Sequence, residues 1–461
     1  MSFLETTSSK GLVREGACDA VKIGAAETYI SPLGVFLGAT PIQIGVLATL
    51  PPFVGSISQV VGMWLSERAA SRAKIVTALI RVQSLLCLPI ACLAILLGAG
   101  WTAAAALILL VSLYQVTIGL IAPVWSSLAG DIIPPTSRGE FFGYRNKWMA
   151  ILTFGGVLVG GQVLHASATM GTAAEGYLVL FLIAASFRFL SSFALRQVSD
   201  PALHIPDESK FSFFQFMARA RKSNFVKFVL FVSFMNFGTS ISGPYFAMYM
   251  LQDLRFTYHE YTVVVATVVL AQFLVMRSWG AISDQFGNRK ILMVCGSLVA
   301  LNPLFWLLSS RLWYVVLIQL YSGVFWAGFN LAAANFVFDA VTAPKRARCI
   351  AYQAIINGFF VLSGSLLGGY LATSLPADWG DALGYFVQPS KFLSLFVLSG
   401  ILRVLAVAWL LPRFKEVRAV DHIPSHELIV RITAIRPLFG ATYTFLSGGY
   451  SAVSRRGRKQ S

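Results

Sequence analysis

Charged residues are scarce in this sequence of 461 residues. They make up 12% of the chain, whereas 56% of its residues are hydrophobic and the mean hydropathy is +0.70. Typical soluble domains carry about 25% charged residues. A soluble protein of this length would need many more polar groups to cover its surface. The composition therefore predicts an integral membrane protein with almost all of its chain in the bilayer.

Several chemical signatures are also missing. The sequence contains no GxxxxGK[ST] loop, so nothing in this chain would bind ATP to drive a reaction. Its five cysteines show neither metal-ligand spacing nor a basis for disulfides, and we interpret them as small packing residues. No hydrolytic or metal-binding constellation is visible. We therefore expect neither an enzyme nor a bound metal or cofactor.

The long apolar stretches fit helices that cross the membrane. Spans near 20 residues cross about 30 Å of hydrocarbon as a helix. These stretches contain many Gly and Pro residues, and their apolar and polar residues do not alternate with a period of two, which excludes a β-barrel. Residues 1–17 lack the apolar core of a signal peptide, so the first span would serve as its own insertion signal. The expected spans are 18–39, 42–66, 73–98, 101–130, 142–168, 174–197, 225–252, 258–283, 290–309, 312–341, 349–375 and 391–412.

The net charge of +16 is distributed unevenly. Most of the 36 Lys and Arg residues fall in the loops of one side, and the opposite loops hold only Arg255, Arg311 and Lys391. This asymmetry indicates membrane topology rather than nucleic-acid binding. By the positive-inside rule both termini lie in the cytoplasm, and we expect a bacterial cytoplasmic (inner) membrane.

A polar stretch at 198–224 divides the chain into two groups of six spans. The predicted organisation is a cytoplasmic segment 1–17, a half at 18–197, a central loop at 198–224, a second half at 225–412 and a cytoplasmic tail at 413–461. Residues of the first half recur in the second half at one constant distance along the sequence. Six residue pairs share it: Asp131 and Asp339, Arg138 and Arg346, Tyr144 and Tyr352, Gly156 and Gly364, Gly160 and Gly368, Gly161 and Gly369.

The segment "WGAISDQFGNRKIL" (Trp279–Leu292) carries the second repeated signal. Its acidic residue and basic pair follow the eighth span, as "LSERAASRAKI" follows the second. A short loop of the form Gly-x-x-x-Asp-Arg-x-Gly-Arg-Arg/Lys in both halves of a twelve-span chain resembles the major facilitator superfamily. The second copy fits at Gly280, Asp284, Gly287 and Arg289, whereas the first copy is degenerate. The resemblance implies an all-α fold of two pseudo-symmetric six-helix halves, and it says nothing about the substrate.

The resemblance also implies that acidic and basic groups of these loops latch the cytoplasmic side during transport. Carboxylates at the membrane rim can make charge-assisted hydrogen bonds that break and re-form. The alternative is that these charges only set the topology. The expected gating residues are Glu67, Arg72, Asp131, Arg138, Asp284, Arg289, Asp339 and Arg346.

Glu27 is the carboxylate that we expect well inside a cavity-lining span. It shares a stripe with Gly24, Ser31 and Gly34. A buried acid is costly, and an isolated one prefers its protonated form, so Glu27 is the candidate for proton coupling. The alternative is a local pair with Lys22 near the cytoplasmic rim.

Polar residues at helical spacing mark the expected substrate cavity between the halves. Together they suggest aromatic walls with amide contacts, which suit a neutral or amphipathic organic solute. Each could instead bridge neighbouring helices. The candidates are Tyr114, Gln115, Asn236, Gln272, Gln319, Trp326, Asn330 and Asn357.

Basic residues within or beside the spans have other expected roles. Arg81 and Arg277 are expected to snorkel toward the interface, and Arg188 and Arg403 to be structural residues of peripheral spans. The cluster beginning at Arg145 is expected to contact anionic lipid headgroups, and the alternative is that it attracts an acidic substrate. The tail after 413 either lies on the membrane or is partly disordered.

These features predict a monomeric secondary active transporter for a small organic solute, coupled to protons and embedded in membrane lipids. Import and export both remain open. The alternative is a non-transporting relative that acts as a membrane receptor or an assembly factor.

Overall fold

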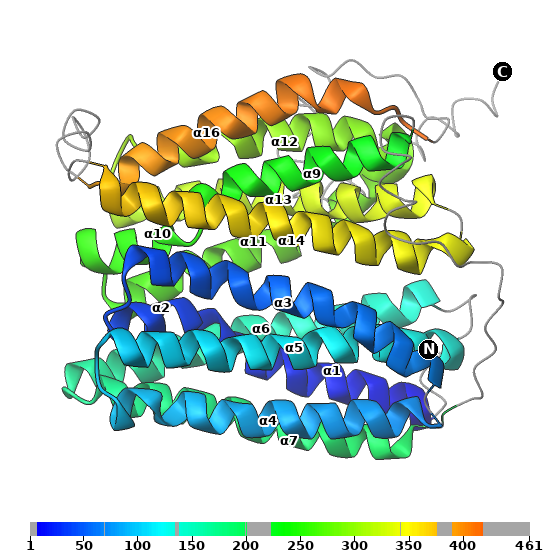
Figure 1. Cartoon of the computed structure of the whole chain (residues 1–461), viewed down its shortest axis with the longest axis horizontal. Coiled ribbons are helices and arrows are strands. Elements are labelled where there is room, and N and C mark those ends of the chain that lie inside the picture. The colour runs from blue at the N-terminus through cyan, green and yellow to red at the C-terminus, as the bar shows by residue number, and fades with distance from the viewer. Residues whose placement is uncertain are drawn as a thin grey trace, which may run out of the picture.

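The computed structural model describes residues 7–68, 70–133, 138–198, 200, 223–341, 343–375 and 390–417. The described part is helical and falls into two groups of helices that run side by side (Figure 1). The predicted central loop and tail lie almost entirely outside the described residues. So do the side chains of four predicted gating residues: Glu67, Arg138, Asp284 and Arg346.

The first half contains six spans, and its first span is broken. Helix α1 ends at Ala25, where Ala26 leaves the helical conformation with φ −129° and ψ −49°. The elements are α1 (Thr7–Ala25), the 3₁₀ turn η2 (Glu27–Tyr29), α2 (Ile30–Phe36), α3 (Pro41–Arg68), α4 (Arg72–Leu96), α5 (Trp101–Ile132), α6 (Arg138–Thr169), α7 (Ala173–Ala194) and the 3₁₀ turn η4 (Leu195–Gln197).

The second half repeats this arrangement, again with an interrupted first span. Its elements are α9 (Asn224–Ser242), α10 (Tyr245–Met248), the π-helical turn η6 (Tyr249–Asp253), α11 (Tyr258–Phe286), α12 (Asn288–Phe305), α13 (Leu312–Ala340), α14 (Ala343–Ser374), α16 (Phe392–Trp409) and the 3₁₀ turn η7 (Leu411–Arg413). The turn between α11 and α12 passes through Gly287 at φ +80°, a conformation that favours glycine.

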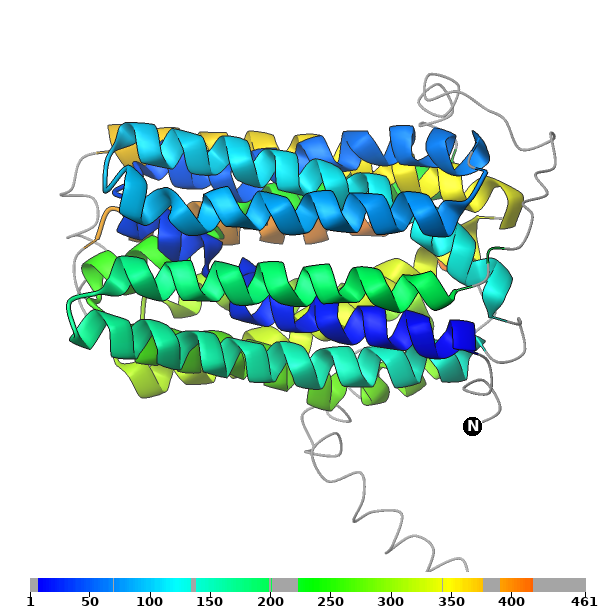
Figure 2. The same cartoon turned by 90° about the horizontal axis from the view of Figure 1, so that it is seen from below.

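Ten helical segments are long and apolar enough to cross a membrane. The first span (α1 to α2) and α12 lie beside them and complete the predicted twelve (Figures 1 and 2). Helix α1 starts at Thr7, eleven residues before the expected span, and carries charge along its length. Helix α12 is 18 residues long and opens with Arg289 and Lys290. The two-half, twelve-helix prediction is confirmed.

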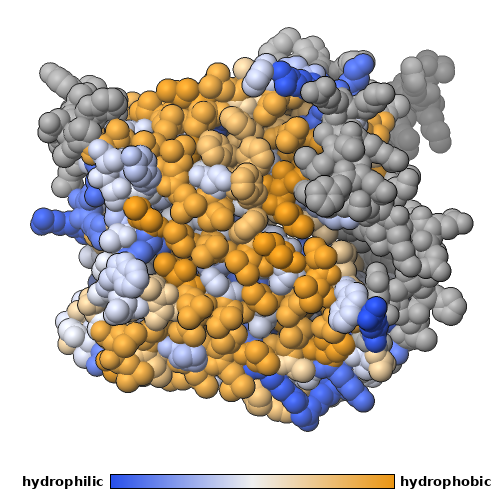
Figure 3. All heavy atoms as spheres, in the orientation of Figure 1, coloured by the Kyte–Doolittle hydropathy of each residue, from blue (hydrophilic) through white to orange (hydrophobic). Residues whose placement is uncertain are grey.

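The surface has the polarity that a membrane requires. Apolar residues cover the middle of the visible face, and hydrophilic residues gather toward the two ends of the helices (Figure 3). Both ends of the described chain lie at one end of the bundle (Figure 1). We call this the terminal end and the opposite one the far end.

The apolar core is continuous between the halves only at the far end. One buried cluster there joins Tyr29, Leu33 and Tyr177 of the first half to Tyr245 and Trp306 of the second. At the terminal end each half has its own buried cluster, one around Val76 and Leu128, the other around Phe228 and Phe336. The described core thus divides in two toward the terminal end.

Two helix pairs form the junction between the halves: α3 with α14, and α6 with α11. Glycine permits close approach in the second pair, because a Cβ at Gly161 would lie 1.9 Å from Thr262 Oγ1. Four hydrogen bonds cross the junction between described residues: Tyr29 with Thr262, Gln162 with His259, Tyr177 with Tyr258, and Ser365 with the Gly45 carbonyl. All four lie in the far half of the helices.

Candidate functional site

The first half contains a buried network of ion pairs that begins on α1. Glu15, Asp19 and Lys22 are spaced by four and three residues, so they share one face of the helix. Lys22 Nζ lies 2.9 Å from Asp19 Oδ1 and 2.8 Å from Glu27 Oε1. Lys22 therefore joins the acidic face of α1 to the carboxylate at the helix break.

Two arginines from other helices complete the network. Arg188 of α7 lies 3.1 Å from Glu15 Oε1 and 2.8 Å from Asp19 Oδ1, and its Nε–H donates to Gln83. Arg145 of α6 lies 3.2 Å from Glu15 Oε2. Burying charges is costly unless they are paired, and here each charge faces at least one of opposite sign.

Glu27 is paired rather than isolated, contrary to the sequence-based expectation. The Tyr114 hydroxyl donates to the same oxygen that contacts Lys22, and the Lys22 ammonium lies 5.3 Å from the Tyr114 ring centre. A void of about 10 Å³ beside them is lined by residues of α1, η2, α2, α4, α5 and α7. Glu27 therefore faces the interior of the first half, and its pair with Lys22, the alternative interpretation, is present.

The prediction that Arg145 contacts lipid headgroups is wrong. Its guanidinium lies 4.5 Å from the Trp125 ring centre, and its side chain is 12% exposed. The ion pair with Glu15 draws Arg145 into the bundle. Arg188, which we expected to be a structural residue, is an internal ion-pair partner with 3% of the residue exposed.

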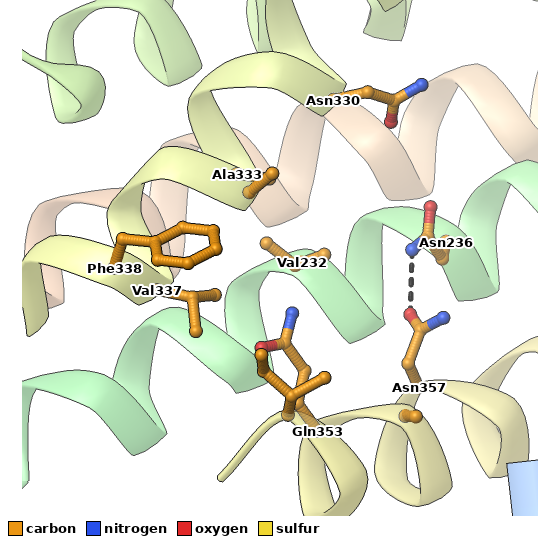
Figure 4. Close-up of a pocket in the computed structure, with 11 residues that line it drawn as sticks. Val232, Asn236, Asn330, Ala333, Val337, Phe338, Gln353 and Asn357 are labelled. Carbon is orange, nitrogen blue, oxygen red and sulfur yellow. Dashed lines mark hydrogen bonds between the residues drawn. The ribbon is translucent and has the colours of Figure 1, made fainter. Parts of the chain in front are cut away.

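The second half holds a separate cavity of about 350 Å³ between α9, α13 and α14. It lies between the middle of these helices and the terminal end. Three predicted residues line it: Asn236, Asn330 and Asn357. Asn236 donates from Nδ2 to Asn357 Oδ1 at 2.7 Å, and Figure 4 shows the two amides facing each other.

Gln353 of α14 also lines this cavity. Its Oε1 is buried and accepts no hydrogen bond from the described residues. The other lining side chains are apolar: Val232, Ala333, Ala334, Val337, Phe338, Ile350 and Ala354. The cavity thus offers amide groups, one with a free acceptor, in otherwise apolar walls.

The other predicted cavity residues lie elsewhere, and one of them, Tyr114, is the partner of Glu27 described above. Gln115, Gln272 and Gln319 are half-buried on α5, α11 and α13, outside the cavity lining. Trp326 packs against the core of the second half, with its ring 5.5 Å from that of Phe329. None of these residues lines this cavity, so their role in binding a substrate stays a prediction.

The predicted gating residues form different contacts in the two halves. Arg72 donates to Asp131 Oδ2 at 2.6 Å and to Asp200 Oδ1 at 3.1 Å. Burial alone would raise the pKa of Asp200, but hydrogen bonds from the Ala73 N–H, Ser71 and Arg72 hold it below its usual value. This cluster fastens the start of α4 to the end of α5.

In the second half the corresponding acid has a neutral partner. Asn288 donates to Asp339 Oδ2 at 2.7 Å and also contacts Ser283. Arg289 instead binds the segment after α16, donating from Nε to the Phe414 carbonyl at 2.8 Å. Asn288 therefore lies in a polar cluster that fastens α11 and α12 to α13. Among the described residues no group of His, Cys, Asp and Glu is arranged to hold a metal ion.

Comparisons with known proteins agree with this architecture. The model of the Major Facilitator Superfamily matches residues 228–454. The tetracycline resistance protein, class B, of Escherichia coli is 27% identical over 118 residues, which span 26% of this chain and 29% of that protein. That match is too short to transfer an activity.

Solved transporters have the same fold over nearly their whole length. The nucleoside transporter NupG superposes with a TM-score of 0.64 at 14% identity, covering 88% of this chain and 99% of that one. The D-xylose–proton symporter gives a TM-score of 0.64 at 12% identity, covering 90% and 98%. At such identities the likeness shows the fold alone. The family model that matches this chain, together with its twelve-helix architecture, identifies this multi-pass membrane protein as a member of the major facilitator superfamily, a family of transporters rather than enzymes.

Proposed function

We propose that the protein is a secondary active transporter that moves a small neutral organic solute by alternating access. The division of the core carries this proposal. The halves share one apolar core at the far end and have separate cores at the terminal end. Such an arrangement closes the far side and leaves the cavity of the second half on the terminal side.

The chemistry of the cavity favours a neutral solute. A volume of about 350 Å³ lies within the usual range of roughly 300–1,000 Å³ for small-molecule sites. None of its described lining residues is charged. The free Gln353 acceptor and the Asn236–Asn357 pair suit a solute with hydrogen-bond donors and acceptors beside an apolar body.

We assign proton coupling to Glu27 together with Lys22 and Tyr114. A proton on Glu27 removes the charge that faces Lys22, while Lys22 keeps its contact with Asp19. A proton drives a conformational change only if the two states differ in proton affinity. The helix break at Ala26 places Glu27 where a movement of α1 against α2 would alter its contact with Lys22.

We further propose that the membrane is a bacterial cytoplasmic membrane with the terminal end in the cytoplasm, following the excess of basic residues there. In this orientation the structure faces inward. Closing the terminal end would then bring the gating loops together, with Asp284 and Glu67 as the latch acids. Solute, protons and surrounding lipid are the expected partners of a monomer.

The test uses the purified full chain in proteoliposomes. A thermal-shift screen of neutral and charged compounds first selects a solute. Uptake driven by a pH gradient is then compared with solute exchange in the absence of a gradient. The variant Glu27→Gln should lose gradient-driven accumulation and retain much of the exchange. Glu175→Gln, at an exposed acid in the first turn of α7, is the matched control and should behave like the parent.

Each outcome bears on a separate part of the proposal. Accumulation by Glu27→Gln equal to that of the parent would overturn proton coupling through Glu27. Exchange restricted to charged solutes would overturn the substrate class. Solute binding without any transport would favour the receptor or assembly-factor alternative.

A further inference from the structure

A second large hollow lies in the first half, away from the amide cavity. It has a volume of about 440 Å³ and is formed by the start of α4 and the turn η4 that follows α7. Its position is the terminal end of the bundle, at the level where the apolar surface gives way to charge. The lining residues are Ser71, Ala73, Lys74, Thr77, Ala78, Arg81, Leu195, Arg196 and Val198. We call it the basic groove.

Three cations line the basic groove, and none of its described lining residues is acidic. Among the described residues, Lys74, Arg81 and Arg196 form no ion pair, because Asp200 nearby is held by Arg72 and the Ala73 N–H. Arg81 Nε lies 3.4 Å from Ser192 Oγ, and the Arg196 guanidinium lies 4.7 Å from a Phe ring centre. Neither contact neutralises charge, so the described lining of the groove carries three positive charges without a paired acid.

The surface next to the groove is apolar and exposed. One turn further along α4, Val82 is 48% and Leu85 is 61% exposed. On the adjacent α7, Phe189 is 43% and Phe193 is 41% exposed. Arg81 and Arg196 thus stand at the head of an apolar strip formed by both helices. A ligand that suits both parts has an anionic head and hydrocarbon chains.

We propose that the basic groove binds one anionic phospholipid from the leaflet at the terminal end. The phosphate lies between Lys74, Arg81 and Arg196, and the acyl chains follow the strip of Val82 and Phe193. An inorganic phosphate would satisfy the cations but would leave the apolar strip unused. Juxtamembrane cations attract anionic lipid by about 1 kcal/mol each, or roughly fivefold in affinity per residue.

The test measures lipid binding to the purified full chain in a neutral detergent. Phosphatidylglycerol, phosphatidylcholine with the same acyl chains, and inorganic phosphate are titrated separately. Bound lipid is followed by native mass spectrometry and by the shift in thermal unfolding, since a ligand that binds the folded state stabilises it. Phosphatidylglycerol should bind, stabilise the protein and lose affinity as salt is added.

A triple variant, Lys74→Gln with Arg81→Gln and Arg196→Gln, should bind phosphatidylglycerol roughly 100-fold more weakly. The matched control replaces three cations near the same end of the second half: Lys227→Gln, Lys290→Gln and Lys415→Gln. This control should bind like the parent. The proposal is overturned if the triple variant binds like the parent, if the control loses as much affinity, if phosphatidylcholine binds equally, or if inorganic phosphate stabilises the protein equally.

Discussion

Arg188 and Arg403 are buried arginines in corresponding places of the two halves. Each lies on the last span of its half and packs against the first, α7 on α1 and α16 on α9. Their residues are 3% and 1% exposed. Arg188 contacts two carboxylates of α1, whereas Arg403 donates to the Val299 carbonyl and to Ser242 Oγ, with no carboxylate among the described residues.

The difference shows how the two halves have diverged on one scaffold. The first half keeps a charged interior in which a proton can change the balance of ion pairs. The second half replaces those acids with hydroxyls and amides and encloses a neutral cavity. If this division is functional, substitutions of corresponding residues should have unequal effects on stability and transport.

The largest expected effect is that of Arg188→Met. Removing one member of a buried ion pair leaves an uncompensated charge, at a cost of about 3–5 kcal/mol. Arg403→Met should change stability by less than about 1 kcal/mol, because it removes a cation without a described acidic partner. Ser242 also retains its hydrogen bond with Ser399. Thermal unfolding of both variants in detergent checks the contrast, and equal losses would contradict it.

Arg72 and Arg289 give a second, smaller contrast. Arg72 is buried and bonded to two acids, so Arg72→Gln should destabilise the protein by about 2 kcal/mol. Arg289 is half-buried and its side chain donates to a backbone carbonyl, so Arg289→Gln should cost about 1 kcal/mol or less. Denaturant or thermal unfolding measures the pair, and a larger loss for Arg289→Gln would reverse the comparison.

The amide pair in the cavity should affect binding more than stability. Asn357→Leu leaves the Asn236 amide without its partner and should cost about 1 kcal/mol. Replacing both with leucine should restore most of the stability and weaken solute binding about tenfold or more. Thermal unfolding with and without solute separates these effects. Unchanged solute binding in the double variant would show that the pair is not part of the substrate site.

The smallest expected effect is pH dependence at Asp200. Its pKa is lower in the folded protein than in the unfolded chain, so its contribution is present above the unfolded value of about 3.9 and is lost as pH falls through the folded value. Because this carboxylate is near the surface, the contribution should be below about 1 kcal/mol. The stability difference between the parent and Asp200→Asn should therefore shrink below pH 4. A constant difference would disprove the linkage.

The sequence predicted the architecture because span length, charge asymmetry and the internal repeat each indicate it independently. It also predicted Asn236, Asn330 and Asn357 as polar cavity residues, and all three line the cavity of the second half. The sequence did not show which polar residues of a helix face this cavity. Gln319 and Trp326 do not line it, and membrane helices are apolar on most sides, so their sequence marks no single polar face. Which polar residue lines a cavity depends on how neighbouring helices pack, and the sequence of one helix does not contain that information.

The ion-pair network was missed for a different reason. The regular spacing of Glu15, Asp19 and Lys22 was visible, but the first span was expected to begin at 18. Charges before that point were interpreted as lying outside the bilayer. Their main partner, Arg188, lies on a helix far along the chain, and only the fold brings the two together.

The close approach of α6 and α11 has a practical consequence. Any side chain added at Gly161 meets Thr262 at the seam that closes the far end. Gly161→Ala would therefore act as a wedge between the halves, outside both the amide cavity and the ion-pair network. It offers a way to enrich a conformer that is open at the far end, which is the outward-open one in the proposed orientation, for structure determination.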